Sequence, residues 1–275
     1  MNFAYEKPKT PEALAALLTE YGSRACLLAG GTDLLVRLRA RLLAPEILID
    51  VKGVEELHEL QHHADGTVSL GAAVVANRLV DDKRLRPVLG SLSDASAQIA
   101  TYAIRNRATI AGNIANASPC ADSVPPLCVL GATVEVRSSR GTRSLTLPQY
   151  IQGVRATVRR PDEYIAAVHI PAQSPSTRTF FRKHQRVRGH DLALANAALL
   201  VDPDGKHLRI AIGSRSPAPV VLELDDLFTT MDGEEAARRA MGAIAPISDV
   251  RSSAEYRTDM TGVLVRRLFA AAKAG

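Results

Sequence analysis

Apolar and polar residues in the first fifty positions follow helix spacing and strand spacing in turn. Thr10-Pro11-Glu12 is a typical helix start, because Thr can cap, Pro fits the first turn and Glu suits the positive end. Leu14 and Leu18 lie on one face of that helix, and Gly22 can close it. The pattern then predicts a strand, a helix that Pro45 ends, and a second strand, at residues 25–29, 34–42 and 47–51.

The middle of the chain is predicted to contain two hairpins and a helical stretch. Asp65-Gly66 and Arg140-Gly141 are turn sequences, and each is flanked by alternating segments. The flanking strands, a further strand and the helical segments are expected at residues 57–61, 67–70, 134–137, 143–147, 165–170, 79–92 and 95–100. The second glycine-bearing loop follows the helical stretch.

The last hundred residues have the order of an α+β module. The polar segment Ala172-Gln173-Ser174-Pro175-Ser176 is the best domain boundary in the chain. Beyond it, strands are predicted at residues 179–183, 193–201 and 208–212, with a turn at Asp202-Pro203-Asp204-Gly205 and helices at 233–244 and 256–272. Strands followed by helices indicate the α+β class.

Composition excludes several classes of protein. No apolar run reaches the roughly 18 residues that a membrane span needs, and no apolar secretory core opens the sequence, so a cytoplasmic protein is expected. The net charge is +5, with its densest basic patch at residues 182–190, but no interleaved aromatics or motif favours nucleic acid. Cys26, Cys120 and Cys128 have no metal-ligand spacing, so no metal site is expected.

Two glycine-bearing loops, about eighty residues apart, carry the strongest chemical signal. The first is Leu28-Ala29-Gly30-Gly31-Thr32-Asp33-Leu34, and the second is Ala108-Thr109-Ile110-Ala111-Gly112-Asn113. Glycine lets backbone approach a ligand closely, and exposed N–H groups can then hold anionic oxygens. Neither loop has the spacing of a Rossmann or P-loop motif. The two loops therefore predict a long phosphate-bearing cofactor held at both ends.

Individual residues can be given roles in such a site. Backbone N–H groups from Gly30 to Leu34 could bind a pyrophosphate, with the Thr32 hydroxyl as a further donor. Asn113 and Asp122 could bind ribose or ribityl hydroxyls. Lys183 could place a positive charge beside a ring that gains negative charge on reduction.

The same residues carry a resemblance to a known family. The runs Ala29-Gly30-Gly31-Thr32-Asp33-Leu34-Leu35 and Ile104-Arg105-Asn106-x-Ala108-Thr109-Ile110-x-Gly112-Asn113, with Ser118-Pro119-x-Ala121-Asp122, resemble the FAD-binding subunit of the molybdenum hydroxylases. That group includes xanthine dehydrogenase, carbon monoxide dehydrogenase and 4-hydroxybenzoyl-CoA reductase. The resemblance extends through the region from Lys183 to Ala193 and the closing stretch from Ser252 to Arg267, so it covers nearly the whole chain.

The resemblance implies a fold and a set of cofactor contacts. It implies an α+β protein with a two-part flavin-binding domain of the vanillyl-alcohol-oxidase type over residues 1–174, divided at about residue 55, and a smaller α+β domain over 175–275. FAD would lie extended between the parts. Its expected contacts are Leu28, Ala29, Gly30, Gly31, Thr32, Asp33, Leu34, Ala108, Thr109, Gly112, Asn113, Asp122 and Lys183, with His190-Asp191 approaching the ring.

The function implied is electron transfer within an oxidoreductase complex. A molybdenum-cofactor large subunit would oxidise the substrate, and the [2Fe–2S] clusters of a small subunit would pass electrons to FAD. FAD would then reduce NAD or another acceptor. The cofactor does the chemistry, so no catalytic acid or base is assigned. The complex is expected to be cytoplasmic, without nucleic acid or membrane partners.

Departures from the family pattern leave two alternatives open. Ala111 stands where the family usually has Gly, the iron–sulfur insertion of the 4-hydroxybenzoyl-CoA reductases is missing, and Tyr102 is the second loop's only aromatic. A self-sufficient flavin oxidase or reductase on the same fold would need a proton donor, for which Ser118, Cys120 and Tyr102 are candidates by position. A flavin-free scaffold subunit is the other alternative, motivated by Ala111 alone.

Overall fold

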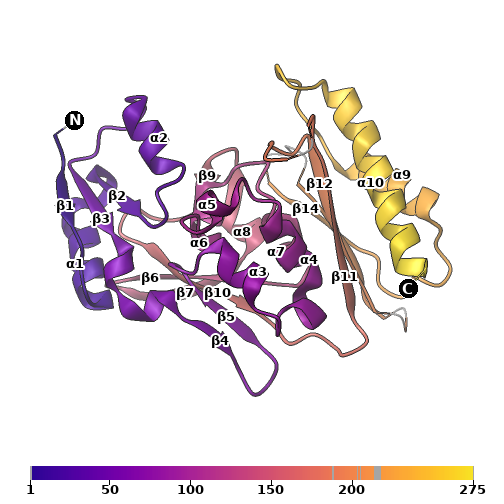
Figure 1. The fold of residues 1–275 in the computed structure, drawn as a ribbon, viewed down its shortest axis with the longest axis horizontal. Coiled ribbons are helices and arrows are strands. Elements are labelled where there is room, and N and C mark those ends of the chain that lie inside the picture. Colours follow the sequence, from indigo (N-terminus) through magenta and orange to yellow (C-terminus); the bar gives the residue numbers. More distant parts are fainter. Residues whose placement is uncertain (1, 188, 203, 205, 214–217, 275) are drawn as a thin grey trace.

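In the described residues, three larger sheets and the two-stranded β8–β9 sheet are present, and the larger ones follow one another along the long axis, with the N-terminal unit at one end and the last two helices at the other (Figure 1). The structure is a computed structural model that describes residues 2–187, 189–202, 204, 206–213 and 218–274. Helices and strands are mixed throughout, as the sequence predicted.

The N-terminal unit is a parallel three-stranded sheet in the order β1-β3-β2. Its elements are β1 (Ala4–Glu6), α1 (Pro11–Tyr21), a 3₁₀ turn (Gly22–Arg24), β2 (Ala25–Leu28), α2 (Leu34–Arg39) and β3 (Ile47–Asp50). The Thr10 side chain accepts a hydrogen bond from the Ala13 N–H, and Gly22 closes α1 with a positive φ of 52°. The predicted capping of α1 is therefore confirmed.

Two features of this unit differ from the sequence prediction. Helix α2 ends at Arg39 instead of continuing to Pro45, because Arg41 adopts a left-handed conformation with φ of 56°. Strand β1 was not predicted, since three exposed residues are too few to show a period. It pairs in parallel with β3, which places β3 at the centre of the sheet.

The second sheet is antiparallel and has the order β4-β5-β10-β6-β7. Its strands are β4 (Leu60–His62), β5 (Val68–Gly71), β6 (Thr133–Ser138), β7 (Gly141–Thr146) and β10 (Tyr164–Ile170). Both predicted hairpins are confirmed, with Gly66 and Gly141 at positive φ in their turns. Strand β10 returns between β5 and β6 and so joins the two hairpins.

Short helices cover one face of this sheet (Figure 1). They are α3 (Ala76–Asp81), α4 (Arg86–Ala97), α5 (Tyr102–Arg105), α6 (Ile110–Asn116), α7 (Val124–Val129) and α8 (Leu147–Tyr150). Two 3₁₀ turns (Val51–Gly53 and Glu55–His58) and a small hairpin of β8 (Ile151–Gly153) and β9 (Ala156–Thr157) complete the region. The predicted helical stretch is divided into α3 and α4, and Leu89 interrupts α4 with non-helical dihedral angles.

The C-terminal region is a four-stranded antiparallel sheet backed by two helices. Its elements are β11 (Arg178–His184), β12 (Ala195–Val201), β13 (Leu208–Ile212), β14 (Val220–Glu223), α9 (Gly233–Ala243) and α10 (Ala254–Ala274). Strand β14 was missed by the sequence analysis. Of the predicted turn at 202–205, Pro203 and Gly205 lie outside the described residues, as does Arg188 of the basic patch.

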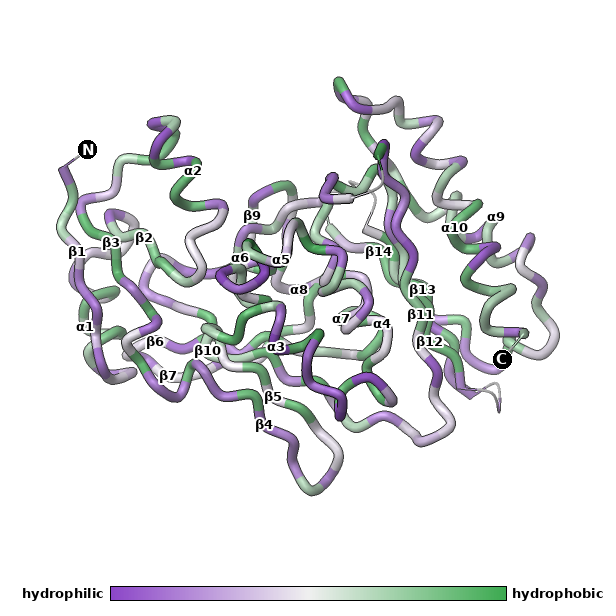
Figure 2. The backbone as a smooth tube through the Cα atoms, viewed as in Figure 1, coloured by the Kyte–Doolittle hydropathy of each residue, from purple (hydrophilic) through white to green (hydrophobic). Residues whose placement is uncertain are grey.

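Strand β12 is buried along its whole length because both faces of its sheet are covered. Leu199 and Val201 pack with Phe269 of α10, whereas Ala198 and Leu200 belong to the core of the preceding region. Hydrophobic residues accordingly concentrate where β11 to β13 pass between the two sets of helices (Figure 2). Burial on both faces explains a continuous apolar strand. In the described part of the chain, no helix is both long and apolar enough to cross a membrane.

A buried carboxylate ties β7 to the turn before β10. Both oxygens of Glu163 accept hydrogen bonds from Arg143, at 2.8 and 2.9 Å, and one also accepts the Arg160 N–H at 2.7 Å. Burial raises the pKa of Glu163, but the Arg143 and Arg160 hydrogen bonds outweigh it and hold the pKa below its ordinary value. The ionised form of Glu163 therefore stabilises the fold.

Replacing Glu163 by Gln is expected to lower the free energy of unfolding at pH 7 by about 1.5–3 kcal/mol, the range for hydrogen bonds to charged groups. The folded-state pKa is depressed, so the contribution is complete above the unfolded pKa of about 4.3 and is lost as the pH falls through the folded pKa. Urea unfolding at a series of pH values measures it. The control Glu46→Gln alters an exposed pair with Arg24 and should change the stability by less than about 1 kcal/mol. A Glu163→Gln effect that stayed constant on acidification would contradict the assignment.

Candidate cofactor-binding site

The first glycine loop lies at the carboxyl edge of the parallel sheet. Strand β2 ends at Leu28, in register with Asp50 at the end of β3, and the loop follows at once. Ligands of parallel sheets characteristically bind at this edge. Gly31 needs a positive φ of 74°, which favours glycine. Among the described residues, none accepts a hydrogen bond from the backbone N–H groups of Gly30 to Leu34.

The second loop lies directly against the first. A Cβ placed on Gly30 would lie 1.9 Å from the Arg107 carbonyl oxygen, so only glycine permits this approach. The Ala108 carbonyl accepts the Ala76 N–H at 2.8 Å, which anchors the second loop to the start of α3. The side chain of Thr109 caps α6 by accepting the Gly112 N–H at 3.0 Å. The two motifs, far apart in the sequence, thus form one surface.

A polar bridge closes one end of this surface. Asn116 donates from Nδ2 to Asp33 at 2.8 Å, and Arg155 donates to Asp33 at 3.2 Å and to Asn116 at 2.6 Å. Asp33 was predicted as a cofactor contact, whereas Asn116 and Arg155 were missed. Neither belongs to a motif, so no sequence signal could have identified them. The bridge neutralises the Asp33 carboxylate, which would otherwise repel a phosphate.

Asn113 and Asp122 lie behind the second loop and have partners within the protein. Asn113 Oδ1 accepts the Ser123 hydroxyl at 2.7 Å, which leaves its Nδ2 without an acceptor among the described residues. Asp122 accepts Lys183 Nζ at 2.7 Å on one oxygen and Asn196 Nδ2 at 2.9 Å on the other. Both carboxylate oxygens of Asp122 are therefore engaged.

Lys183 reaches the site from β11 of the C-terminal sheet. Its side chain and that of Asp122 are 1% and 7% exposed, so they form a buried ion pair between the two regions. Burial raises the pKa of Asp122, and the Lys183 charge and the hydrogen bonds from Lys183 and Asn196 act against this. Asn196 is fully buried, and its Oδ1 has no hydrogen-bond partner. The pair places Lys183 beside Asp122, which balances its charge; that Lys183 contacts the cofactor stays a prediction.

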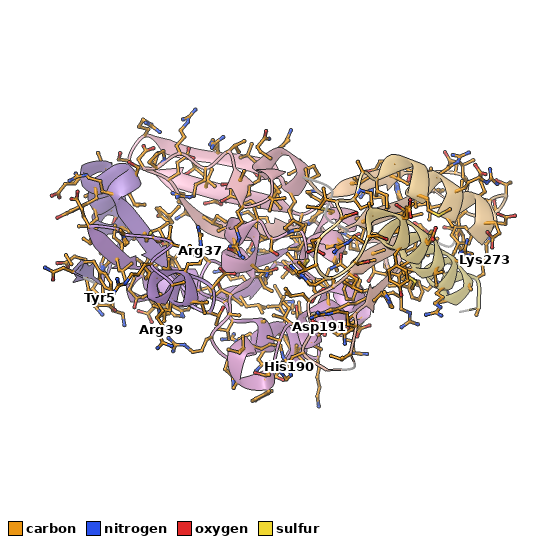
Figure 3. The ribbon with its side chains drawn as sticks, turned by 90° about the horizontal axis from the view of Figure 1, so that it is seen from above. Tyr5, Arg37, Arg39, His190, Asp191 and Lys273 are labelled. Carbon is orange, nitrogen blue, oxygen red and sulfur yellow. The ribbon has the colours of Figure 1, made fainter. Side chains whose placement is uncertain are left out.

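His190 and Asp191 lie on the exposed loop after β11 (Figure 3). Asp191 accepts two hydrogen bonds from the Arg186 guanidinium, at 2.9 and 3.1 Å. Ala111 lies inside α6, is 4% exposed and is absent from the residues with positive φ. Its methyl group therefore causes no backbone strain at this position.

The arrangement of donors fits a dinucleotide-type cofactor. Free N–H groups on the first loop can hold a pyrophosphate, and a buried amide oxygen on Asn196 lacks a donor. The residues of both regions meet at this surface. Among the described residues, no group of three His, Cys, Asp or Glu side chains is placed to hold a metal ion.

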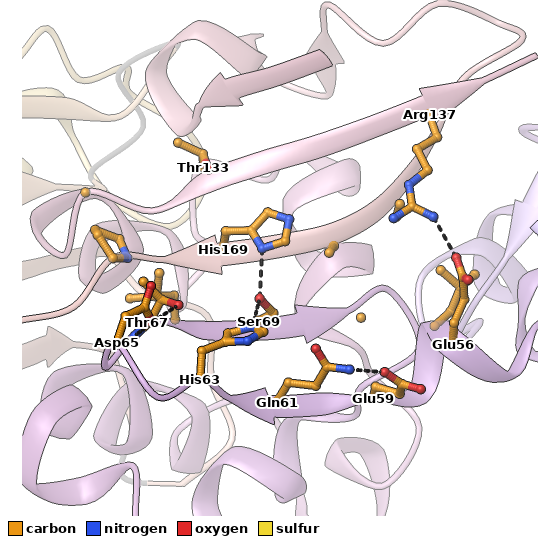
Figure 4. Close-up of a pocket in the computed structure, with 17 residues that line it drawn as sticks. Glu56, Glu59, Gln61, His63, Asp65, Thr67, Ser69, Thr133, Arg137 and His169 are labelled. Atoms are coloured by element: carbon orange, nitrogen blue, oxygen red, sulfur yellow. Dashed lines mark hydrogen bonds and ion pairs between the residues drawn. The ribbon is translucent and has the colours of Figure 1, made fainter. Parts of the chain in front are cut away.

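A second hollow of about 700 Å³ lies on the open face of the β4-β5-β10-β6 strands (Figure 4). His63 and His169 each hydrogen bond to Ser69, at 2.8 and 2.9 Å, and His169 also contacts Glu135 at 2.7 Å. Glu56, Glu59 and Asp65 line the hollow. Its carboxylates would repel phosphates, and polar pairs are usual on the solvated face of an antiparallel sheet. None of the glycine-loop residues that are predicted to bind the cofactor lines this hollow.

The fold and the paired glycine loops define a two-region protein whose open N–H groups suit a phosphate-bearing cofactor. Residues 1–173 match the family described as "FAD binding domain in molybdopterin dehydrogenase", and residues 179–272 match "CO dehydrogenase flavoprotein C-terminal domain". The chain belongs to this family of FAD-binding medium subunits of molybdenum-dependent dehydrogenases, which are oxidoreductases, and its cofactor is FAD.

Individual relatives agree over almost the full length. The carbon monoxide dehydrogenase medium chain of Hydrogenophaga pseudoflava is 32% identical, with 98% of this chain and 97% of the relative covered. The xanthine dehydrogenase FAD-binding subunit of Escherichia coli O157:H7 is 26% identical over 91% of this chain and 89% of the relative. The solved structure of reconstituted carbon monoxide dehydrogenase from Oligotropha carboxidovorans superposes with a TM-score of 0.92 at 31% identity, covering 100% of this chain and 98% of that one.

Replacing Gly30 by Ala is expected to weaken FAD binding by roughly a hundredfold, which corresponds to about 2.8 kcal/mol. The new methyl group would meet the Arg107 carbonyl and push the two loops apart. Gly242→Ala is the matched control, because nothing lies within 4 Å of its Cβ position and α9 favours alanine. Fluorescence titration with FAD measures the Kd. Equal affinity of Gly30→Ala and wild type would show that the loop contact is not needed.

Breaking the buried ion pair is expected to be costly only when one charge remains. Lys183→Met leaves Asp122 buried without its counter-charge and should reduce the free energy of unfolding by about 3–5 kcal/mol. The double variant Asp122→Asn/Lys183→Met removes both charges and keeps an acceptor for Asn196, so most of the stability should return. Chemical unfolding of the three proteins measures this. A double variant as unstable as Lys183→Met would rule out the charge argument.

Proposed function

We propose that this chain is the electron-transfer flavoprotein of a molybdenum hydroxylase complex, receiving electrons from the [2Fe–2S] clusters of a small subunit. A large subunit with the molybdenum cofactor would oxidise the substrate, and NAD would be the final acceptor. FAD, when bound, supplies the exchange between single electrons and electron pairs. Relatives named as subunits or chains of such dehydrogenases support these partners.

The observation that carries the proposal is the row of N–H groups at Gly30 to Leu34 that have no acceptor among the described residues, on a loop whose Gly30 lies against the second glycine-bearing loop. In this proposal Leu28, Ala29, Gly30, Gly31, Thr32, Asp33 and Leu34 hold the pyrophosphate side of FAD, and Ala108, Thr109, Gly112 and Asn113 line its flavin half. The Asp122–Lys183 pair closes the flavin end and links it to the C-terminal sheet. These residues bind and orient the cofactor and need no proton transfer of their own.

Three further assignments belong to the proposal. The two-part region over residues 1–174 is of the vanillyl-alcohol-oxidase type, divided at about residue 55. Residues 175–275 form the second domain, and the complex works in the cytoplasm. The parallel sheet of β1 to β3 and the antiparallel sheet of β4 to β10 support the two-part description.

The proposal predicts FAD binding followed by electron release to NAD⁺. The purified chain should take up FAD in stoichiometric amount and show its absorbance bands. After anaerobic reduction with dithionite, addition of NAD⁺ should restore the oxidised flavin spectrum and produce NADH. The control is the same reduced protein with a quinone in place of NAD⁺.

The outcomes separate the parts of the proposal. Reoxidation by the quinone alone would overturn NAD as the acceptor and keep the electron-transfer function. Failure to take up FAD would overturn the flavoprotein function itself and favour the scaffold alternative.

A further inference from the structure

A lysine that the sequence motifs did not include lies directly behind the first glycine loop. Lys52 belongs to the 3₁₀ turn that follows β3, at the same carboxyl edge of the parallel sheet. Its Nζ donates to the Ala29 carbonyl at 2.6 Å and lies 3.5 Å from the Leu28 carbonyl. The ammonium group is therefore bound to the backbone just before Gly30.

Two other side chains hold this ammonium group in place. Asp50 is 4% exposed, and its Oδ1 accepts Lys52 Nζ at 2.6 Å and the Lys52 N–H at 3.0 Å. Its Oδ2 accepts the Tyr5 hydroxyl at 2.7 Å. Tyr5 is on β1, Asp50 on β3 and the Leu28 carbonyl on β2, so every strand of the sheet contributes to the arrangement. Nζ is thus held on one side by Asp50 of the sheet and on the other by the Ala29 carbonyl of the loop.

The direction of one carbonyl determines the direction of the next N–H. The chain has no cis peptide bond among its described residues, so the Ala29 carbonyl and the Gly30 N–H point in opposite directions from one planar unit. Because Lys52 binds the Ala29 carbonyl, the Gly30 N–H points away from Lys52. That N–H is the first of the groups that find no acceptor among the residues that the structure describes.

We propose that Lys52 is a positioning residue for the FAD pyrophosphate, holding the Ala29–Gly30 peptide so that its N–H faces the cofactor. The inference rests on the proposed function only in that FAD binds at this loop. Lys52 acts through the backbone and does not touch the phosphates. Substituting Lys52 should therefore weaken the binding of ligands that carry a pyrophosphate and of no others. If Lys52 served only as a structural ion-pair partner of Asp50, its loss would affect all ligands alike.

The test compares ligands with and without a pyrophosphate. In Lys52→Met the Kd for FAD should rise by about tenfold to a hundredfold, since a charge-assisted hydrogen bond that fixes the loop is lost. The Kd for riboflavin, which lacks phosphates, should stay at the wild-type value. Lys52→Arg keeps the charge and donors and should restore part of the affinity. Lys9→Met, which removes an exposed lysine of the same unit, should leave both Kd values unchanged.

A second measurement separates positioning from folding. The melting temperature of each variant without cofactor reports its stability, and the titrations are performed well below it. Equal losses for FAD and riboflavin, or an unchanged Kd for FAD in Lys52→Met, would overturn the inference. If riboflavin binds wild type too weakly to measure, ADP and AMP are compared instead: ADP, which carries a pyrophosphate, must lose affinity in parallel with FAD, and AMP, which carries a single phosphate, must keep its wild-type Kd. Failure of wild type to bind FAD would instead overturn the proposed function.

Discussion

The close approach of Gly30 to the Arg107 carbonyl is the contact on which the arrangement of the site depends. It joins the edge of the parallel sheet to the loop between α5 and α6, which belongs to a different sheet region. Without a side chain at residue 30, two backbones meet and their remaining N–H groups stay available. A row of N–H groups that is left open on a half-buried loop can bind an anionic ligand.

The second constraint is the docking of the C-terminal sheet. Strand β12 has apolar side chains on both faces, so its sheet holds α9 and α10 on one side and packs against the preceding region on the other. Lys183 and Asn196 reach Asp122 across this interface. A buried ion pair contributes little net stability but penalises any arrangement that separates its partners. The pair thus specifies how the two regions meet beside Asp122.

Much of the fold follows from local patterns in the sequence. The capped helix α1, both glycine hairpins and the long strands β10, β12 and β13 were predictable because their signals are carried by neighbouring residues. Strands β1 and β14 were not, since short strands depend on pairing with partners distant in the sequence. Helix α2 ends early because Arg41 has a left-handed conformation. Arginine does not favour that conformation, so the sequence could not predict it.

For the candidate site, the sequence predicted the residues of the two glycine loops, whose backbone groups are open. It did not predict the residues whose side chains support these loops. Glycine leaves a recognisable signal, whereas Asn116, Arg155 and Lys52 act through contacts with carbonyls and carboxylates that only the folded chain brings near. Asn, Arg and Lys side chains are common on any protein surface, so their presence alone does not indicate such a role. Their roles become visible only as hydrogen bonds, because an Asn, Arg or Lys side chain that donates to a carbonyl or a carboxylate has no characteristic spacing in the sequence.

A cofactor site built from N–H groups places most of its specificity in backbone geometry. Side chains at the loops can then vary as long as the peptide planes keep their directions. What must be retained is the support from behind: the buried Asp50 that fixes the Lys52 ammonium, and the Arg155 guanidinium that neutralises Asp33. These contacts come from the sheet and from the β8–β9 hairpin, so the loop is held by elements outside it. Rigid support of this kind reduces the entropy lost on binding, because the donors are already oriented before the phosphates arrive.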